Sequence, residues 1–91
     1  MVTRRKGNVL EADIHGMSAM QAKKALEQLL SRADDSLQEL VVIHGYNGGQ
    51  VLRDMVQRQL KHRRIAVKLL SLNPGATRLL LKKRGDGDGL R

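Results

Sequence analysis

Cysteine, tryptophan and phenylalanine are absent from this 91-residue chain, and proline and tyrosine occur once each. Without cysteine the chain can form no disulfide, zinc–thiolate site or thiol nucleophile, so a reducing cytoplasm is its natural setting. The longest uninterrupted apolar run extends only from Leu40 to Ile43, and no apolar stretch follows the basic N-terminus. We therefore expect one small domain with neither a signal peptide nor a membrane span.

Basic residues outnumber acidic ones by 17 to 9, which gives a formal net charge of +8. They gather at residues 4–6, 61–64 and 82–84, with Lys68 and Arg78 between the last two groups. This imbalance favours a polyanionic partner, and nucleic acid is the commonest polyanion. Tyr46 is the only aromatic residue, so the sequence predicts no stacking platform for single strands.

The apolar pattern predicts the element order βαβαββ. Strands are expected over residues 9–15, 37–43, 65–72 and 77–82, and helices after Ser18 and from Val51 to Lys61. Ser18 and Gln21 have the spacing of a capping box at the start of the first helix. Residues 1–7 and 84–91 are predicted to be flexible, which leaves a domain over residues 8–83.

Strand–helix–strand connections are right-handed, so the first two strands should be parallel and both helices should cover one face of the sheet. The predicted fold is therefore an α/β two-layer sandwich with a four-stranded mixed sheet. The unbroken run Leu40 to Ile43 predicts an interior place for the second strand. On the open face we expect a basic surface formed by Arg78, Lys82, and Lys68 or its neighbours, beside Glu11, Asp13 and His15.

Two predicted strands end in the same way, with His15-Gly16 and His44-Gly45, each before a helix. Open α/β sheets bind ligands at the carboxyl ends of their strands, and a helix N-terminus favours anions. Asp13 and His15 are two residues apart on one strand, so both project to one face and the carboxylate can orient the imidazole. We expect His44 to supply a second imidazole, so that the two histidines act as base and acid on one phosphodiester.

Two other interpretations of these residues remain open. In one of them, His15 and His44 only hydrogen-bond to the loop backbone and hold the glycine turns in shape. His62 lies at the basic end of the second predicted helix, where a surface position is the simplest interpretation. Glu11, Asp13 and His15 could also hold one hydrated Mg²⁺ or Mn²⁺, although the chain offers no set of bridging carboxylates for a two-metal site. General acid–base chemistry is the favoured interpretation, with a metal as the alternative.

Three motifs of this chain resemble those of the Smr domain, in order and in spacing: Asp13-Ile14-His15-Gly16, His44-Gly45 with its glycine-rich loop, and Pro74-Gly75-Ala76-Thr77. The resemblance covers residues 8–83. The Smr domain occurs at the C-terminus of MutS2 proteins and alone in small bacterial proteins. The resemblance implies a fold similar to the C-terminal domain of bacterial translation initiation factor 3, and binding or endonucleolytic cleavage of DNA or RNA. Ala12 and Asn47 replace a leucine and a glycine of the usual family pattern.

Together these features predict an Smr-type endonuclease in which Asp13, His15 and His44 are catalytic. A nucleic-acid- or ribosome-binding module without catalysis is the alternative, whereas a domain for an acidic protein partner leaves Asp13 and His15 unexplained. The sequence does not decide between DNA and RNA, or the oligomeric state. The expected nucleic-acid contacts are Gly16, Gly45, Tyr46, Asn47, Gly48, Gly49, Arg63, Arg64, Lys68, Arg78 and Lys82.

Overall fold

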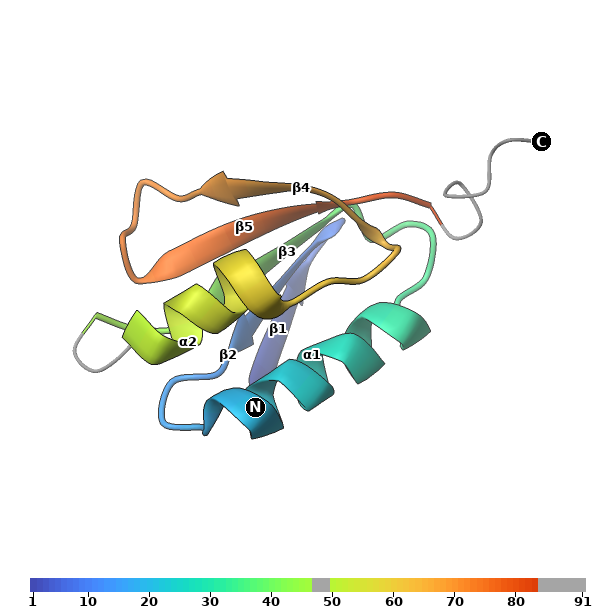
Figure 1. Cartoon of the computed structure of the whole chain (residues 1–91). Coiled ribbons are helices and arrows are strands. Elements are labelled where there is room, and N and C mark those ends of the chain that lie inside the picture. Colours follow the sequence, from blue (N-terminus) through green and yellow to red (C-terminus); the bar gives the residue numbers. More distant parts are fainter. Residues whose placement is uncertain (47–49, 84–91) are drawn as a thin grey trace.

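The computed structural model describes residues 1–46 and 50–83, which form one five-stranded sheet covered by helices (Figure 1). The sheet order is β1-β2-β3-β5-β4, with β2 and β3 parallel and all other neighbours antiparallel. The strands are β1 (Val2–Lys6), β2 (Val9–Asp13), β3 (Glu39–Ile43), β4 (Ile65–Leu70) and β5 (Ala76–Leu81).

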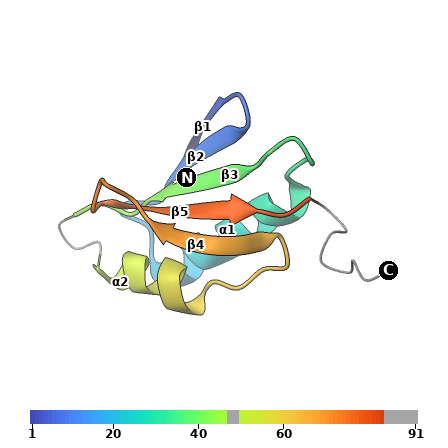
Figure 2. The same cartoon turned by 90° about the horizontal axis from the view of Figure 1, so that it is seen from above.

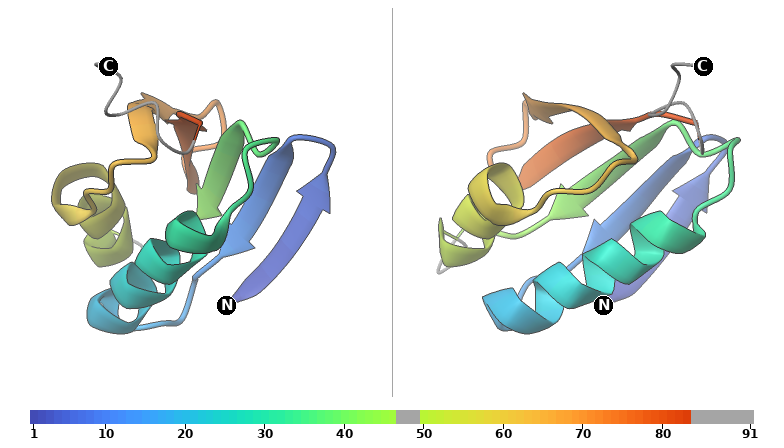
Figure 3. Two further views of the ribbon diagram at one scale, coloured as in Figure 1. Left: turned by 90° about the vertical axis from the view of Figure 1, so that its right-hand side faces the viewer. Right: turned by 45° about the vertical axis from the view of Figure 1, so that its right-hand side comes forward.

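Two helical segments lie on the same face of this sheet (Figure 3). They are α1 (Ala19–Arg32) and α2 (Gln50–Asp54), the latter continuing into the single π-helical turn η1 (Met55–Gln59). The predicted α/β two-layer sandwich and the interior place of β3 are therefore confirmed. No helix in residues 1–46 and 50–83 has the length and apolar character that crossing a membrane requires.

The N-terminal segment corrects the expectation of a four-stranded sheet. Instead of being flexible, Val2–Lys6 form β1, which pairs with β2 along its whole length at one edge of the sheet (Figure 2). Gly7 makes the hairpin possible because its φ of 60° suits a tight turn. Every residue of β1 is exposed, so the strand has no apolar alternation by which it could be recognised in the sequence.

The core lies between the sheet and the helices, and it is built from alternate strand residues. The side chain of Ser18 caps α1 by accepting from the Gln21 backbone N–H at 3.1 Å, and the Gln21 side chain accepts from the Ser18 N–H at 3.5 Å, so the predicted capping box is confirmed. This cap fixes the start of α1 directly after His15-Gly16. The fully buried apolar side chains include Ala12, Ile14, Ala22, Leu26, Leu30, Leu40, Val42, Val56, Leu60 and Leu79.

The opposite face of the sheet is open and carries Arg78 as the sequence predicted, but acidic side chains pair with its arginines, so it is not a purely basic surface. Arg4 lies 3.7 Å from Glu11, and Arg78 donates two hydrogen bonds to Glu39, the shorter of them 2.7 Å long. Lys68 does not belong to this face, because it stands opposite the buried Leu79 and therefore faces the helices. The middle of the open face is apolar and includes Val41, Ile43, Leu69 and Leu80.

Candidate functional site

The two His-Gly motifs meet at the carboxyl ends of the parallel strands β2 and β3. The Ile14 N–H donates to the carbonyl of Ile43 at 2.9 Å. A Cβ atom built on Gly45 would lie 3.5 Å from the Cβ of His15, so the two motifs are in contact. Gly16 and Gly45 have φ values of 83° and 87°, which other residues rarely adopt, and both turns therefore depend on glycine.

His15 forms an exposed pair with Asp13. Its Nδ1 lies 2.5 Å from Oδ1 of Asp13, and the same oxygen accepts from the His15 backbone N–H at 3.1 Å. The hydrogen bond from His15 holds the pKa of Asp13 below its usual value, against the opposing effect of burial. An ionised Asp13 accepts the Nδ1 proton and so leaves Nε2 free to take up a proton. Because the His15 side chain is 71 % exposed, this nitrogen is accessible to a substrate.

His44, in contrast, is 1 % exposed and lies on the helix side of the sheet. Its Nε2 is 3.0 Å from Oγ1 of Thr77, an oxygen that also accepts from the Gln57 side-chain amide at 3.0 Å. Burial lowers the pKa of His44, which favours the neutral ring. The neutral tautomer that fits these contacts donates from Nδ1 to the Gly45 carbonyl and accepts the Thr77 hydroxyl proton at Nε2.

The register between β2 and β3 explains why the two imidazoles do not meet. Asp13 stands opposite Ile43, which places Ile14 beside His44 and His15 beside Gly45. The side chain of His44 therefore points to the same buried face as those of Leu40 and Val42. The side chain of His15 points to the open face, as that of Asp13 does. The expected pairing of two histidines on one phosphodiester is corrected on this ground.

The turn before β5 brings the third motif to the same place. The carbonyl of Gly75 accepts from the backbone N–H groups of His44 and Gly45, at 2.9 and 3.0 Å. Asn73 Oδ1 accepts from both the Tyr46 hydroxyl, at 2.7 Å, and the Gly75 N–H, at 2.8 Å. The expected contacts at Asn47, Gly48 and Gly49 lie outside the described residues.

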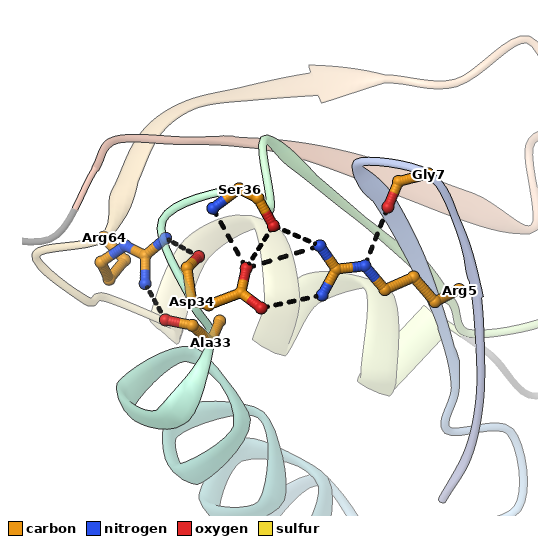
Figure 4. A network of polar contacts seen from close by, with 6 residues as sticks. All are labelled: Arg5, Gly7, Ala33, Asp34, Ser36 and Arg64. Carbon is orange, nitrogen blue, oxygen red and sulfur yellow. Dashed lines mark hydrogen bonds and ion pairs between the residues drawn. The ribbon is translucent and has the colours of Figure 1, made fainter.

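Two of the expected phosphate-binding side chains donate to main-chain carbonyls of the protein instead. Arg64 is 3 % exposed and donates to the carbonyls of Lys82, Ala33 and Asp34, the last two of which are drawn in Figure 4. Lys68 donates to the carbonyls of Gln57 and Leu60 at the end of η1, and burial lowers its pKa. Arg64 is buried and so is not available to a phosphate, and Lys68 is directed to main-chain carbonyls on the helix side of the sheet, so both expectations are corrected.

Other basic side chains keep their charge at the surface, but at different ends of the sheet. Arg63 precedes β4 and Lys82 follows β5, which places both at the end opposite His15. The end of the sheet that carries His15 has Arg53 and Arg58 instead, which line a 250 Å³ groove together with Pro74. The only sign of this groove in the sequence is the outward position of both arginines on their helix.

The donor set for a metal is also incomplete at this end of the sheet. Glu11 faces Arg4, and no group of three or more His, Cys, Asp or Glu side chains in the described part of the chain is arranged to hold a metal ion. Glu11, Asp13 and His15 therefore do not form the three-donor set that the sequence left open. The chemistry that the arrangement supports is proton transfer through Asp13 and His15.

Comparison with known proteins agrees with this geometry. A family model described as the Smr domain matches residues 12–78. No curated protein and no solved structure matches the chain. The matched span contains both His-Gly motifs and the turn before β5, and it covers more than half of the 91 residues. The chain therefore belongs to the Smr domain family.

Proposed function

We propose that this protein binds nucleic acid and cleaves RNA, with Asp13 and His15 as its proton-transfer pair. The observation that carries the proposal is the exposed His15 imidazole, which is oriented by Asp13. It lies at the carboxyl ends of the strands, where open α/β folds bind ligands. The Smr family match and the excess of basic residues support a nucleic-acid substrate. RNA is favoured because its 2′-hydroxyl is an internal nucleophile, for which one base suffices.

In the proposed reaction, Nε2 of His15 takes the proton of a ribose 2′-hydroxyl. The 2′-oxygen attacks the adjacent phosphorus, the bond from phosphorus to the 5′-oxygen breaks, and the leaving 5′-oxygen takes a proton from the imidazolium or from water. The products are a 2′,3′-cyclic phosphate and a 5′-hydroxyl. Asp13 stabilises the imidazolium that forms, and the N-terminus of α1, which has no acidic residue in its first turn, favours the nearby phosphate.

His44 has a different role in this proposal. Its Nε2 bonds to Thr77, whose hydroxyl oxygen also accepts from Gln57, while its own backbone N–H donates to the Gly75 carbonyl. Its contribution is to position Gly45 against His15. A loss of activity in a His44 variant is therefore expected to come with a loss of stability.

The test is incubation of the purified protein with labelled RNA and DNA of one sequence, with and without a chelator. We expect metal-independent cleavage of RNA alone, with cyclic phosphate ends identified by mass spectrometry. His15→Ala should slow cleavage by about 10²-fold or more and leave affinity within about threefold, because it removes a proton-transfer group and no phosphate contact. Asp13→Asn should slow cleavage as well. Glu27→Gln, which also replaces a carboxylate by an amide but at a position on α1 that pairs with Lys23, is the matched control and should cut normally.

Two results would contradict this mechanism. Nicking of DNA that stops when the chelator is added would indicate metal-activated water as the nucleophile. Tight binding without cleavage of either polymer, unchanged in His15→Ala, would leave a nucleic-acid-binding module. The buried position of His44 favours this second candidate function, because it removes one of the two proton-transfer groups that the sequence offered.

A further inference from the structure

Tyr46, the only aromatic residue of the chain, is unusually well placed and unusually exposed. It follows Gly45, the residue in contact with His15, and it is 66 % exposed. Burial of the ring in the core therefore does not explain its presence. A large apolar ring left in water next to a candidate site is a feature of surfaces that bind flat ligands.

The ring is nevertheless held in one orientation. Its hydroxyl donates to Oδ1 of Asn73 at 2.7 Å. Its Cε2 and Cδ2 atoms lie only 3.3 and 3.4 Å from the position that a Cβ of Gly75 would take. Gly75 thus allows the ring to lie directly against the turn, and the Gly75 carbonyl holds the backbone of Gly45. The same short turn fixes both the ring and the motif beside His15, so little conformational freedom is lost when a ligand stacks on the ring.

Several other apolar side chains are exposed at the same end of the sheet as the ring. Among the described residues, Met20, Val51, Leu70 and Leu72 are exposed at this end of the sheet, with Leu72 fully so. Arg53 and Arg58 line the neighbouring groove beside Pro74. A duplex presents phosphates and keeps its bases stacked inside, so it cannot use this combination. An unpaired nucleotide can, because its base offers a flat apolar face and its phosphate can reach an arginine.

We propose that Tyr46 is the stacking platform for one unpaired base next to the scissile phosphate, and that the substrate is single-stranded or locally unpaired. This inference rests on the proposed function and names its substrate class. It differs from the expectation that the chain has no stacking platform. One ring cannot line a long single strand, but it can hold one base.

Because tyrosine occurs once and tryptophan is absent, intrinsic fluorescence of the full chain reports on Tyr46 alone. The probes are single-stranded 2′-O-methyl RNA, which has no free 2′-hydroxyl and stays intact, and the same strand in a blunt duplex. We expect the single strand to quench the tyrosine emission and the duplex to leave it unchanged. N-acetyltyrosinamide titrated in parallel corrects for absorption by the nucleic acid.

Variants test the same point without fluorescence. Tyr46→Leu should weaken single-strand binding by about tenfold, since it keeps an apolar side chain and removes the stacking surface. Tyr46→Phe should restore affinity to within about threefold, because the ring remains and only its bond to Asn73 is lost. Val67→Ala removes an exposed apolar side chain in the middle of β4 instead of at this end, serves as the matched control, and should change affinity less than twofold. Melting temperatures are expected to stay close to that of the unmodified chain, as both side chains are exposed.

Several outcomes separate this inference from the proposed function. Unchanged affinity in Tyr46→Leu, or equal quenching by strand and duplex, would overturn the stacking inference even if RNA is cleaved. Quenching by the single strand with no cleavage of unmodified RNA would support stacking and overturn the proposed cleavage. If neither strand nor duplex binds, both fail.

Discussion

Two arginines that are adjacent in the sequence differ completely in the folded protein. Arg63 is exposed, whereas Arg64 is buried and donates three hydrogen bonds to main-chain carbonyls. Two of these carbonyls, of Ala33 and Asp34, belong to the chain as it leaves α1, where carbonyls have no partner within the helix. The third, of Lys82, follows β5. Arg64 therefore connects the end of α1 to the end of the sheet.

This difference gives a prediction at the scale of one residue. Arg64→Met keeps the length of the side chain but cannot donate, so it should lower the free energy of unfolding by about 2–4 kcal/mol. Arg63→Met, the matched control, should change it by no more than about 0.5 kcal/mol. Urea unfolding followed by circular dichroism measures both. Equal effects of the two substitutions would contradict the structural role of Arg64.

The candidate site could be predicted from the sequence only in part. The pair of Asp13 and His15 follows from a spacing of two on one strand, and the structure shows it. The face of the sheet on which the His44 side chain lies could not be predicted. The unbroken apolar run Leu40 to Ile43 does not indicate which face of the strand packs against the helices. The roles of Arg64 and Lys68 were also out of reach, since a count of charges cannot distinguish a side chain that binds carbonyls from one that faces water.

At the scale of elements, the side chain of Arg5 connects β1 to the segment that follows α1 (Figure 4). Arg5 donates to the carbonyl of Gly7 at 2.8 Å, to Oδ2 of Asp34 at 3.3 Å and to the hydroxyl of Ser36 at 2.7 Å. Hydrogen bonds from Ser36 and then from Arg5 lower the pKa of Asp34 to about 2. These contacts connect an exposed edge strand to the segment that follows α1.

The prediction at this scale concerns acid. A carboxyl whose pKa is lowered by folding stabilises the fold above its ordinary value of 3.8, and that contribution is lost as the pH falls from there towards 2. We therefore expect β1 to loosen between these values before the central strands do. NMR order parameters of Val2–Lys6 should fall while those of β3 persist.

Variants at neutral pH provide the control for this prediction. Arg5→Ala should loosen β1 at pH 7, because it removes the contacts with Asp34 and Ser36. Arg4→Ala changes a neighbour that lies 3.7 Å from Glu11 on the other face, and it should leave β1 ordered. Uniform loosening of all strands in acid, or no effect of Arg5→Ala, would show that other contacts hold β1.

Most elements could be predicted because their apolar spacing and the capping box are local features. The exceptions have non-local causes. The strand β1 forms because β2 offers an edge, and its own residues show no apolar pattern. The expected second helix ends in a π-helical turn, in which the Leu60 N–H bonds to the Met55 carbonyl at 2.7 Å. Lys68, from a later strand, binds the carbonyls of this turn, a contact that no helical periodicity can reveal.

At the scale of the whole molecule, the two ends of the sheet differ in character. The His15 end carries most of the exposed large apolar side chains of the described residues, Tyr46 among them, while Arg63 and Lys82 lie at the other end. Strand β3 has five residues between these ends, a length of about 17 Å at about 3.3 Å per residue. A bound strand must therefore be several nucleotides long to contact both ends.

This separation gives a prediction that depends on the length of the ligand. For a single-stranded dodecamer, the double variant Arg63→Gln/Lys82→Gln should reduce the slope of log affinity against log salt by about 1.4, because each lost phosphate contact on a single strand contributes about 0.7. For a trinucleotide held at Tyr46 the slope should not change. The cleavage rate at saturating RNA should also remain the same, since both substituted residues are remote from His15.

The matched control Arg53→Gln/Arg58→Gln, at the His15 end, should reduce the slope for both ligands. If the slope for the dodecamer is unchanged in the Arg63→Gln/Lys82→Gln variant, the nucleic acid does not reach the end of the sheet opposite His15.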